Sequence, residues 1–260
     1  IYKYLKSIEK FIMRLGCHKW VVVTHQIADF VRLNYKAEEV LLSPNFITLP
    51  NYIELGKSLF SEKNLIYNKQ IKCVLIASNL SQTWQGIDVL VDYINNYINT
   101  YSRDIELSIY GSNLSENIKM KLISIERKSS RFKCKIFPIT TSEKLSKDLI
   151  DFDCGFAPFA LNRKGLVSSA ALKTRLYLTN GIPVISPSQD DALSHLEQSS
   201  QRRLGFFLIK GNKQFNEALE EIDNNKMKYY SSYKVRYFVK SSKNLIMKSS
   251  FMTDLYHLGL

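Results

Sequence analysis

Short apolar segments alternate with longer segments of helical periodicity along most of this 260-residue chain. The short apolar runs predict strands over 71–78, 105–110, 132–137, 154–157, 182–185 and 203–209. Apolar residues at intervals of three or four predict helices over 86–97, around 118–123 (Ile118, Met120, Leu122, Ile123), over 141–149 and after Gly211. Regular alternation of strands and helices is typical of a parallel sheet with helices on both faces. We therefore expect an α/β fold with a Rossmann-like, doubly wound parallel sheet.

The two ends of the chain carry different patterns. The N-terminal part, residues 1–45, predicts an amphipathic helix over 1–15, a buried strand over 19–24 and a helix over 25–35 with Ile27, Phe30 and Val31 on its apolar face. Residues 46–70 show little periodicity, which indicates a linker before the sheet domain at 71–223. Residues 224–260 predict basic helices. Because residues 224–250 contain seven Lys or Arg and no acidic residue, they fit either a solvated basic face or an acidic membrane surface.

Charge and composition limit the classes of binding partner and the cellular location that we expect for the protein. The 36 Lys and Arg exceed the 24 Asp and Glu by 12, and this net charge favours phosphates, acidic lipids or nucleic acid as partners. No nucleic-acid recognition motif is present, so we expect no nucleic-acid partner. The four cysteines lack metal-ligand spacing, which indicates reduced thiols in a cytoplasmic protein. No apolar run approaches the roughly 20 residues of a membrane span. Peripheral contact with the inner face of the membrane is left open by the basic C-terminal segment.

Residues 150–191 contain the most informative chemistry. The strand at 154–157 is followed by a basic loop, Asn162-Arg163-Lys164-Gly165, and by a predicted helix carrying Ser168, Ser169, Lys173 and Arg175. A helix N-terminus beside positive side chains can hold an anion. Lys173 lies one helical turn beyond Ser169 on this predicted helix, where a cation suits a diphosphate. The alternatives are that Lys173 extends to solvent and that the basic loop is merely solvated.

The stretch from Pro158 to Ile185 resembles the donor-binding segment of GT-B glycosyltransferases. In bacterial members that build surface polysaccharides the pattern reads roughly LK-x-REYLA-x-G-x-P, and residues 172–183 of this chain read LKTRLYLTNGIP. The resemblance covers about residues 20 to 190 and is most specific over 151–186. It implies that residues 71–223 bind a nucleoside-diphosphate sugar and that residues 1–45 are the end of an acceptor domain. The implied acceptor is a polysaccharide or a glycolipid.

The same resemblance implies a set of donor-site residues. The loop after the first strand of the sheet resembles the family's W-x-G-x-D loop through Trp84, Gly86 and Asp88, although a tight turn without a ligand explains Gly86 equally well. Gly111 and Pro138 fall where the family has residues beside the nucleotide, and ordinary strand ends are the alternative for both. The full implied set is Ser78, Asn79, Trp84, Gly86, Gly111, Pro138, Lys164, Gly165, Ser168, Ser169, Lys173 and Leu176.

Three positions depart from the family pattern. Leu176 falls where relatives carry the glutamate that holds the ribose hydroxyls. Loss of that charged acceptor costs on the order of 1–3 kcal/mol. Asn79 and Gln85 replace the basic residues of the first loop. Donor binding is therefore expected to be weak, altered or lost.

Several functions follow from these observations. The first is a hexosyltransferase-type glycosyltransferase that uses a nucleoside-diphosphate sugar without a metal ion or other cofactor. The second, which Leu176 favours, is a non-catalytic glycosyltransferase-like subunit that supports an active partner. The third is an unrelated nucleotide-binding α/β module, if the likeness around Lys173 is a coincidence. No catalytic base can be assigned, and we expect structural roles for His18 and His25.

Overall fold

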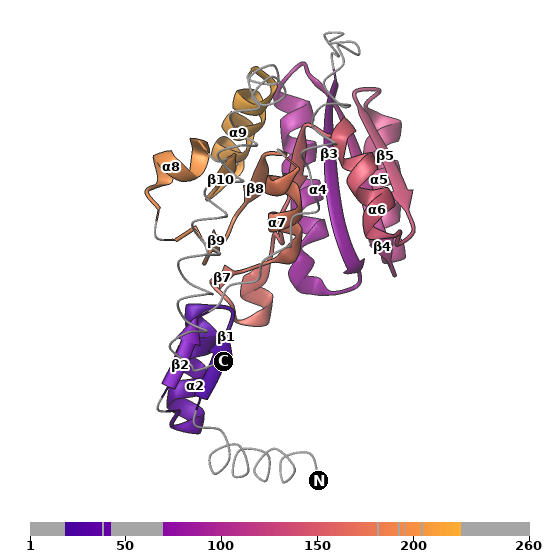
Figure 1. Cartoon of the computed structure of the whole chain (residues 1–260). Helices are drawn as coiled ribbons and strands as arrows, with labels where there is room; N and C mark the ends of the chain where they lie inside the picture. The colour runs from indigo at the N-terminus through magenta and orange to yellow at the C-terminus, as the bar shows by residue number, and fades with distance from the viewer. Residues whose placement is uncertain are drawn as a thin grey trace.

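A computed structural model describes residues 19–37, 39–42, 70–180, 182–191, 193–194, 196–203 and 205–224. Within these ranges the chain forms a six-stranded sheet, two two-stranded sheets and the helices that surround them (Figure 1). The predicted helix at 1–15, the linker except for Gln70, and the predicted basic helices after Asn224 lie outside the described residues.

The six-stranded sheet is parallel throughout. Its strands are β3 (Gln70–Asn79), β4 (Asp104–Ser112), β5 (Phe132–Phe137), β6 (Cys154–Phe156), β8 (Val184–Ser186) and β10 (Phe206–Leu208). Their order across the sheet is β10-β8-β6-β3-β4-β5. The chain therefore starts in the centre at β3, moves outward to β5, returns to β6 beside β3, and moves outward in the other direction. This is the strand order of a Rossmann fold, which confirms the expected fold class.

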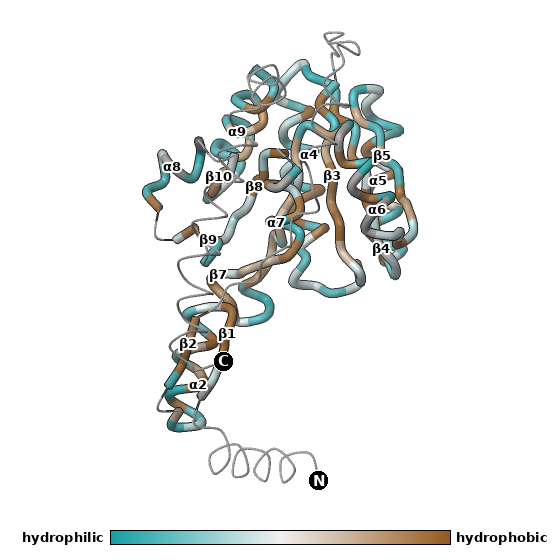
Figure 2. The backbone as a smooth tube through the Cα atoms, in the orientation of Figure 1, coloured by the Kyte–Doolittle hydropathy of each residue, from teal (hydrophilic) through white to brown (hydrophobic). Residues whose placement is uncertain are grey.

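Helices cover both faces of this sheet. One face carries α4 (Ile87–Thr100), α5 (Glu116–Lys128) and α9 (Asn212–Asn224), and the other carries α6 (Ser142–Asp148) and α7 (Leu172–Thr179). Successive side chains of a strand point to opposite faces. Accordingly, Cys73 and Leu75 pack with α4 and α9, whereas Val74 packs with α6 and α7. β3 is thus buried on both sides, and Figure 2 shows it as hydrophobic along most of its length.

The apolar faces of two helices differ from the sequence-based prediction. Met120 of α5 is 60% exposed, and Phe30 of α2 is 51% exposed. A helix advances by 100° per residue, so Leu122 and Ile125 share a stripe that faces the sheet while Met120 lies to one side of it. The prediction used every apolar residue, whereas the helix buries only the stripe that faces the sheet.

A smaller unit precedes the sheet in the chain. It consists of β1 (Lys19–Val22), α2 (His25–Tyr35) and β2 (Glu39–Leu42), and we call it the N-terminal unit. β1 and β2 pair in parallel, and α2 buries Ala28 and Val31 against Val22. In Figure 1 this unit lies outside the six-stranded sheet, next to β7 (Ser168–Ser169).

Ser168 and Ser169 correct one prediction about local structure. They do not belong to the helix that carries Lys173. They form β7, which pairs in parallel with β9 (Gln189–Asp190), and α7 begins only at Leu172. The serine hydroxyl of Ser168 donates to a carboxylate beyond β9 instead of capping a helix.

Candidate functional site

Two loops meet where the strand order reverses, between β3 and β6. The loop after β3 contains the short 3-10 helix η1 (Thr83–Gln85) and leads into α4 on one face of the sheet. The loop after β6 contains η3 (Leu161–Lys164) and leads through β7 to α7 on the other face. In open parallel sheets, ligands bind at this switch point, outside the carboxyl ends of the strands. The two loops are therefore the first place to look for a site.

Backbone contacts join these two loops directly. The N–H of Phe159 donates to the carbonyl of Gln85 at 2.9 Å, and the N–H of Ala160 donates to the carbonyl of Trp84 at 3.3 Å. Gly86 lies in the left-handed region with φ +65°, and a Cβ atom there would lie 2.6 Å from the backbone nitrogen of Ala160. The close approach of the two loops therefore explains Gly86 without a ligand.

Two of the three basic side chains at the site, Arg163 and Lys164, come from η3 and contact the first loop. The guanidinium of Arg163 donates to both carboxylate oxygens of Asp88, at 2.8 and 2.7 Å, and to the carbonyl of Thr83. The hydrogen bond from Arg163 lowers the pKa of the Asp88 carboxyl. The ammonium of Lys164 lies over the ring of Trp84, 5.0 Å from its centroid. Both side chains thus fasten one loop to the other, so the basic loop is not merely solvated.

Lys173 has a different environment. It lies in the first turn of α7, and its ammonium donates to the side-chain oxygen of Gln85 at 2.7 Å. Burial lowers the pKa of this ammonium from 10.5 to about 7. In the described part of the chain no carboxylate pairs with it, and the first turn of α7 contains no acidic residue and no side-chain cap. A lysine and a helix N-terminus therefore meet at the switch point with their positive charge unmatched by these residues.

Tyr177 fixes the position of α7. β3 and β6 pair only at Cys73 and Val74, so the next part of β3 lacks a backbone partner on that side. The hydroxyl of Tyr177 accepts a hydrogen bond from the N–H of Ile76 at 2.9 Å, and its buried ring lies against Gly155. Tyr177 fills the space where the strands separate and anchors α7 beside the switch point.

Other residues of the implied donor set have structural partners. Gly111 lies so close to Leu80 and to the carbonyl of Ala77 that no side chain would fit there. Asn79 accepts hydrogen bonds from the backbone N–H and the hydroxyl of Ser81, and the carbonyl of Ser78 accepts one from Ser112. These contacts shape the ends of β3 and β4.

The last three members of the set lie in different surroundings. Pro138 is exposed just after β5. Leu176 is half-buried and packs against the cluster that contains Tyr110. Gly165 has φ +71° with open space around it, at the end of η3.

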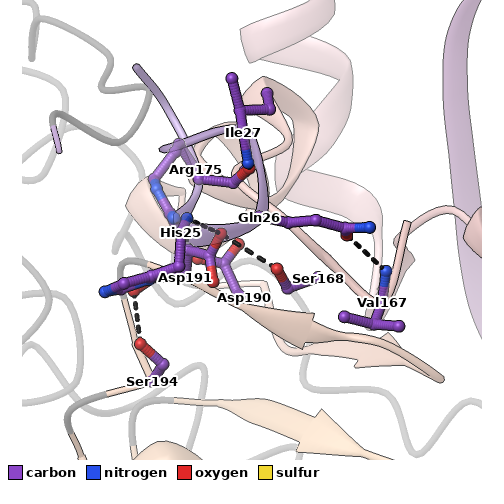
Figure 3. Close-up of polar contacts among 10 residues, drawn as sticks. His25, Gln26, Ile27, Val167, Ser168, Arg175, Asp190, Asp191 and Ser194 are labelled. Carbon is purple, nitrogen blue, oxygen red and sulfur yellow. Dashed lines mark hydrogen bonds and ion pairs between the residues drawn. The ribbon is translucent and has the colours of Figure 1, made fainter. Parts of the chain in front are cut away.

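The N-terminal unit contacts the loop after β6 through the first turn of α2 (Figure 3). The side-chain amide of Gln26 donates to the carbonyl of Gly165 at 2.6 Å and accepts from the N–H of Val167 at 3.0 Å. The buried carboxylate of Asp191 accepts from the hydroxyl of Ser168 at 3.0 Å and from the N–H of His25 at 3.3 Å. Ser168 thus belongs to this contact between the two parts and not to the surroundings of Lys173.

This contact continues to α7. The imidazole Nδ1 of His25 lies 3.5 Å from the Asp191 carboxylate, and the neighbouring Asp190 forms an ion pair with Arg175 of α7. Two adjacent carboxylates at the end of β9 therefore hold different elements: one holds the N-terminal unit and the other holds α7. This agrees with the structural role expected for His25.

Sequence reasoning did not place Asp191 in the site, and it named Gln85 only as a replacement for a basic residue of the first loop. Gln85 was visible as the residue before Gly86 at a strand-to-helix turn, where a side chain reaches the switch point. Asp191 gave no comparable signal, because its partners Ser168 and His25 are 23 and 166 residues away.

Comparison with known proteins identifies the fold. No protein-family model and no curated protein sequence matches the chain. Among solved structures, it is similar to a point mutant of S. aureus TarM in complex with fondaparinux, α-GlcNAc-glycerol and UDP, with a TM-score of 0.62, 12% identity, and coverage of 93% of this chain and 43% of that one. It is also similar to WaaG, a glycosyltransferase involved in lipopolysaccharide biosynthesis (TM-score 0.52, 17% identity, 87% of this chain, 62% of that one).

A third structure gives the same result. The pneumococcal O-GlcNAc transferase GtfA, in complex with UDP and GlcNAc, matches with a TM-score of 0.51, 12% identity, and coverage of 89% of this chain and 45% of that one. The chain therefore has the GT-B glycosyltransferase fold, which confirms the resemblance found in the sequence at the level of the fold. It spans between 43% and 62% of the length of these three proteins. Within the described ranges, no helix is long and apolar enough to cross a membrane.

Proposed function

We propose that this chain binds the nucleoside diphosphate of an activated sugar and is the donor-binding part of a glycosyltransferase. The observation that carries the proposal is the hydrogen bond between Lys173 and Gln85, which places a lysine from α7 beside the start of α4, across the switch point. The first turn of α7 adds backbone N–H groups at the same end of the helix. An anion with several oxygens, such as a diphosphate, matches this combination of donors.

In the proposed reaction the oxygen of the acceptor hydroxyl forms a bond to the anomeric carbon of the bound sugar, and the hydroxyl proton is released to the solvent. The bond between that carbon and the β-phosphate oxygen breaks, and the diphosphate leaves with additional negative charge. Lys173 and the first N–H groups of α7 stabilise this charge as it develops, which is the usual source of catalysis at such sites. We propose that these groups suffice without a metal ion. Undiminished transfer in excess EDTA is the expected result.

The structural neighbours guide the choice of donor and acceptor. The TarM and GtfA structures contain UDP, so uridine diphosphate is the first nucleotide to test. WaaG is involved in lipopolysaccharide biosynthesis, which favours a glycan or lipid-linked acceptor. We propose a cytoplasmic protein that reaches such an acceptor at the inner face of the membrane, with the basic segment at 224–250 facing acidic lipids.

A non-catalytic subunit is the second candidate function. Leu176 favours it, because this side chain packs against an apolar cluster and cannot accept a hydrogen bond from a ribose hydroxyl. A subunit of this kind would keep the fold and its partner contacts but not the transfer reaction. Nucleotide binding together with sugar transfer supports the enzyme, and nucleotide binding without transfer by the full-length product supports the subunit.

Calorimetric titration tests the proposal. The chain is titrated with UDP, UDP-GlcNAc, UDP-glucose and GDP-mannose, and we expect at least one to bind. Lys173→Met should weaken that binding about 10- to 100-fold, because it removes a charge-assisted hydrogen bond. Lys164→Met is the matched control: it removes the same charge from a side chain that lies on Trp84, and it should change the affinity less than about threefold. Failure of the wild-type chain to bind any of these nucleotides would contradict the proposal.

A further inference from the structure

Gln85 is a buried polar residue that makes separate contacts through its backbone and through its side chain. The residue is only 5% exposed, and its backbone carbonyl accepts a hydrogen bond from the N–H of Phe159. An ammonium group can only donate hydrogen bonds. Lys173 therefore fixes the orientation of the Gln85 amide, with the oxygen toward the ammonium. Among the described residues, the amide nitrogen of Gln85 has no hydrogen-bond partner.

The charged groups around this pair are engaged elsewhere. Asp88, at the start of α4, is bound by Arg163 of η3, and Lys164 lies on Trp84. On α7 itself, Arg175 pairs with Asp190. Gln85 is thus the side chain that holds the Lys173 ammonium, and it is neutral.

We propose that Gln85 is a positioning residue: it holds the Lys173 ammonium at the switch point without neutralising it, so that the charge remains available to the β-phosphate of a nucleoside diphosphate. This inference rests on the proposed function and specifies how the site keeps its charge. A carboxylate at position 85 would hold the ammonium equally well but would cancel its charge. An apolar side chain of the same length would leave the charge but release the ammonium from its place. The amide is the side chain that meets both requirements.

Two substitutions at position 85 test separately whether the Lys173 ammonium must be held in place and whether its charge must be kept. In Gln85→Glu the ammonium is held and neutralised, so the affinity for the nucleotide that the wild type binds should fall about 100-fold. In Gln85→Met the ammonium is free to move but keeps its charge, so the affinity should fall only about tenfold. Gln82→Met is the control, because Gln82 is exposed in the same loop and should leave the affinity unchanged. Equal losses in Gln85→Glu and Gln85→Met, or no loss in either, would overturn the inference.

Exchanging the residues at positions 85 and 173 should restore the nucleotide affinity that the single substitution at 173 removes. Lys173→Gln alone should weaken nucleotide binding at least about tenfold. Adding Gln85→Lys restores the same hydrogen bond with its two partners exchanged, and the ammonium returns to the switch point from the start of α4. We expect the double variant to bind within about threefold of the wild type. A double variant as weak as Lys173→Gln would show that the pair does not act as inferred.

A measurement without nucleotide separates this inference from the proposed function. The titration of the Lys173 side chain is followed by NMR of its labelled Cε in wild type, Gln85→Glu and Gln85→Met. The midpoint should be higher in Gln85→Glu than in the wild type and lower in Gln85→Met, since a carboxylate favours the charged ammonium and loss of the acceptor disfavours it. Identical midpoints would overturn the inference even if the nucleotide binds. If no nucleotide binds while the midpoints move as expected, the proposed function fails and the positioning role stands. Gln85→Asn, whose amide is too short to reach, replaces Gln85→Met if that variant does not fold.

Discussion

The two helices that begin at the switch point differ in how their N-terminal charge is matched. At the start of α4 the chain supplies its own anion, Asp88, and Arg163 binds that carboxylate with two hydrogen bonds. At the start of α7 the chain supplies a cation, Lys173, and in the described part of the chain a neutral amide holds it. The positive end of α4 already has an anion from the chain itself, whereas the positive end of α7 gains most from an added anion.

This difference assigns separate tasks to residues that look alike in the sequence. Arg163, Lys164 and Lys173 are three basic residues within eleven positions of each other. Arg163 and Lys164 connect the loop after β6 to the loop after β3, while Lys173 is held where a ligand of this fold would bind. Changes to Gly86 or to the pair of Arg163 and Asp88 should therefore alter stability, and changes to Lys173 should alter ligand binding.

The largest expected effect comes from the glycine at the start of α4. Gly86→Ala requires a left-handed residue to carry a side chain that would lie 2.6 Å from the backbone of Ala160, so we expect the free energy of unfolding to fall by about 3 kcal/mol. Gly165→Ala is the matched control on the α7 side. It has a similar φ but no atom within 4 Å, so the expected loss is about 1 kcal/mol. Urea unfolding measures both values, and equal losses would show that the two loops do not meet as described.

The next effect is the pH dependence of ligand binding at the start of α7. A nucleotide sugar binds the charged form of Lys173, whose pKa in the free protein is lowered to about 7. Affinity should therefore fall as the pH rises above 7, by up to about tenfold per pH unit, with uptake of a proton on binding. Calorimetry with UDP-glucose in buffers of different ionisation enthalpy measures this uptake. The sugar diphosphate lacks the terminal phosphate that would itself titrate near pH 6.

The same ammonium should affect the stability of the free protein in the opposite direction. Between about pH 7 and 10.5 the folded chain has released the Lys173 proton while the unfolded chain still holds it. The free energy of unfolding should therefore rise with pH across this range, and Lys173→Met should reduce the rise.

A pH profile of ligand affinity that is the same in Arg163→Met and wild type, but flat in Lys173→Met, would sharpen the contrast between the two helix starts.

The smallest expected effect concerns the ion pair at the start of α4. Arg163 and Asp88 are both partly exposed, so Arg163→Met should lower the free energy of unfolding by no more than about 1 kcal/mol, and less at high salt. Because Arg163 lowers the pKa of Asp88, the pair's contribution is present at neutral pH and is lost as the pH falls through the native pKa of that carboxyl. Nucleotide affinity should stay within about threefold of the wild type. A loss as large as that of Lys173→Met would remove the distinction between the two helix starts.

Much of the fold could be predicted from periodicity. β5 and α2 begin and end at the predicted residues, Phe132–Phe137 and His25–Tyr35, because each has a strong apolar pattern and a clear boundary. The apolar face of α9, formed by Phe215, Leu219 and Ile222, was also predicted correctly. Periodicity failed at β7, because a two-residue strand is too short to carry a pattern and its partner β9 lies about 20 residues further along the chain.

The candidate site was predictable only in part. The sequence pointed to Lys173 through its position in a strand–loop–helix unit, and the structure places it in the first turn of α7. It could not show that Lys173 contacts Gln85, 88 residues away, or that Arg163 contacts Asp88, 75 residues away. Such contacts depend on which strands lie side by side. The periodicity of a single segment does not determine the order of strands in a sheet.

A crystal structure of the chain with UDP tests the central claim most directly. Lys173 at the start of α7 should lie within hydrogen-bonding distance, about 3 Å, of an oxygen of the diphosphate, while Arg163 remains on Asp88. A diphosphate bound by Arg163 or Lys164, with Lys173 still held only by Gln85, would contradict the account.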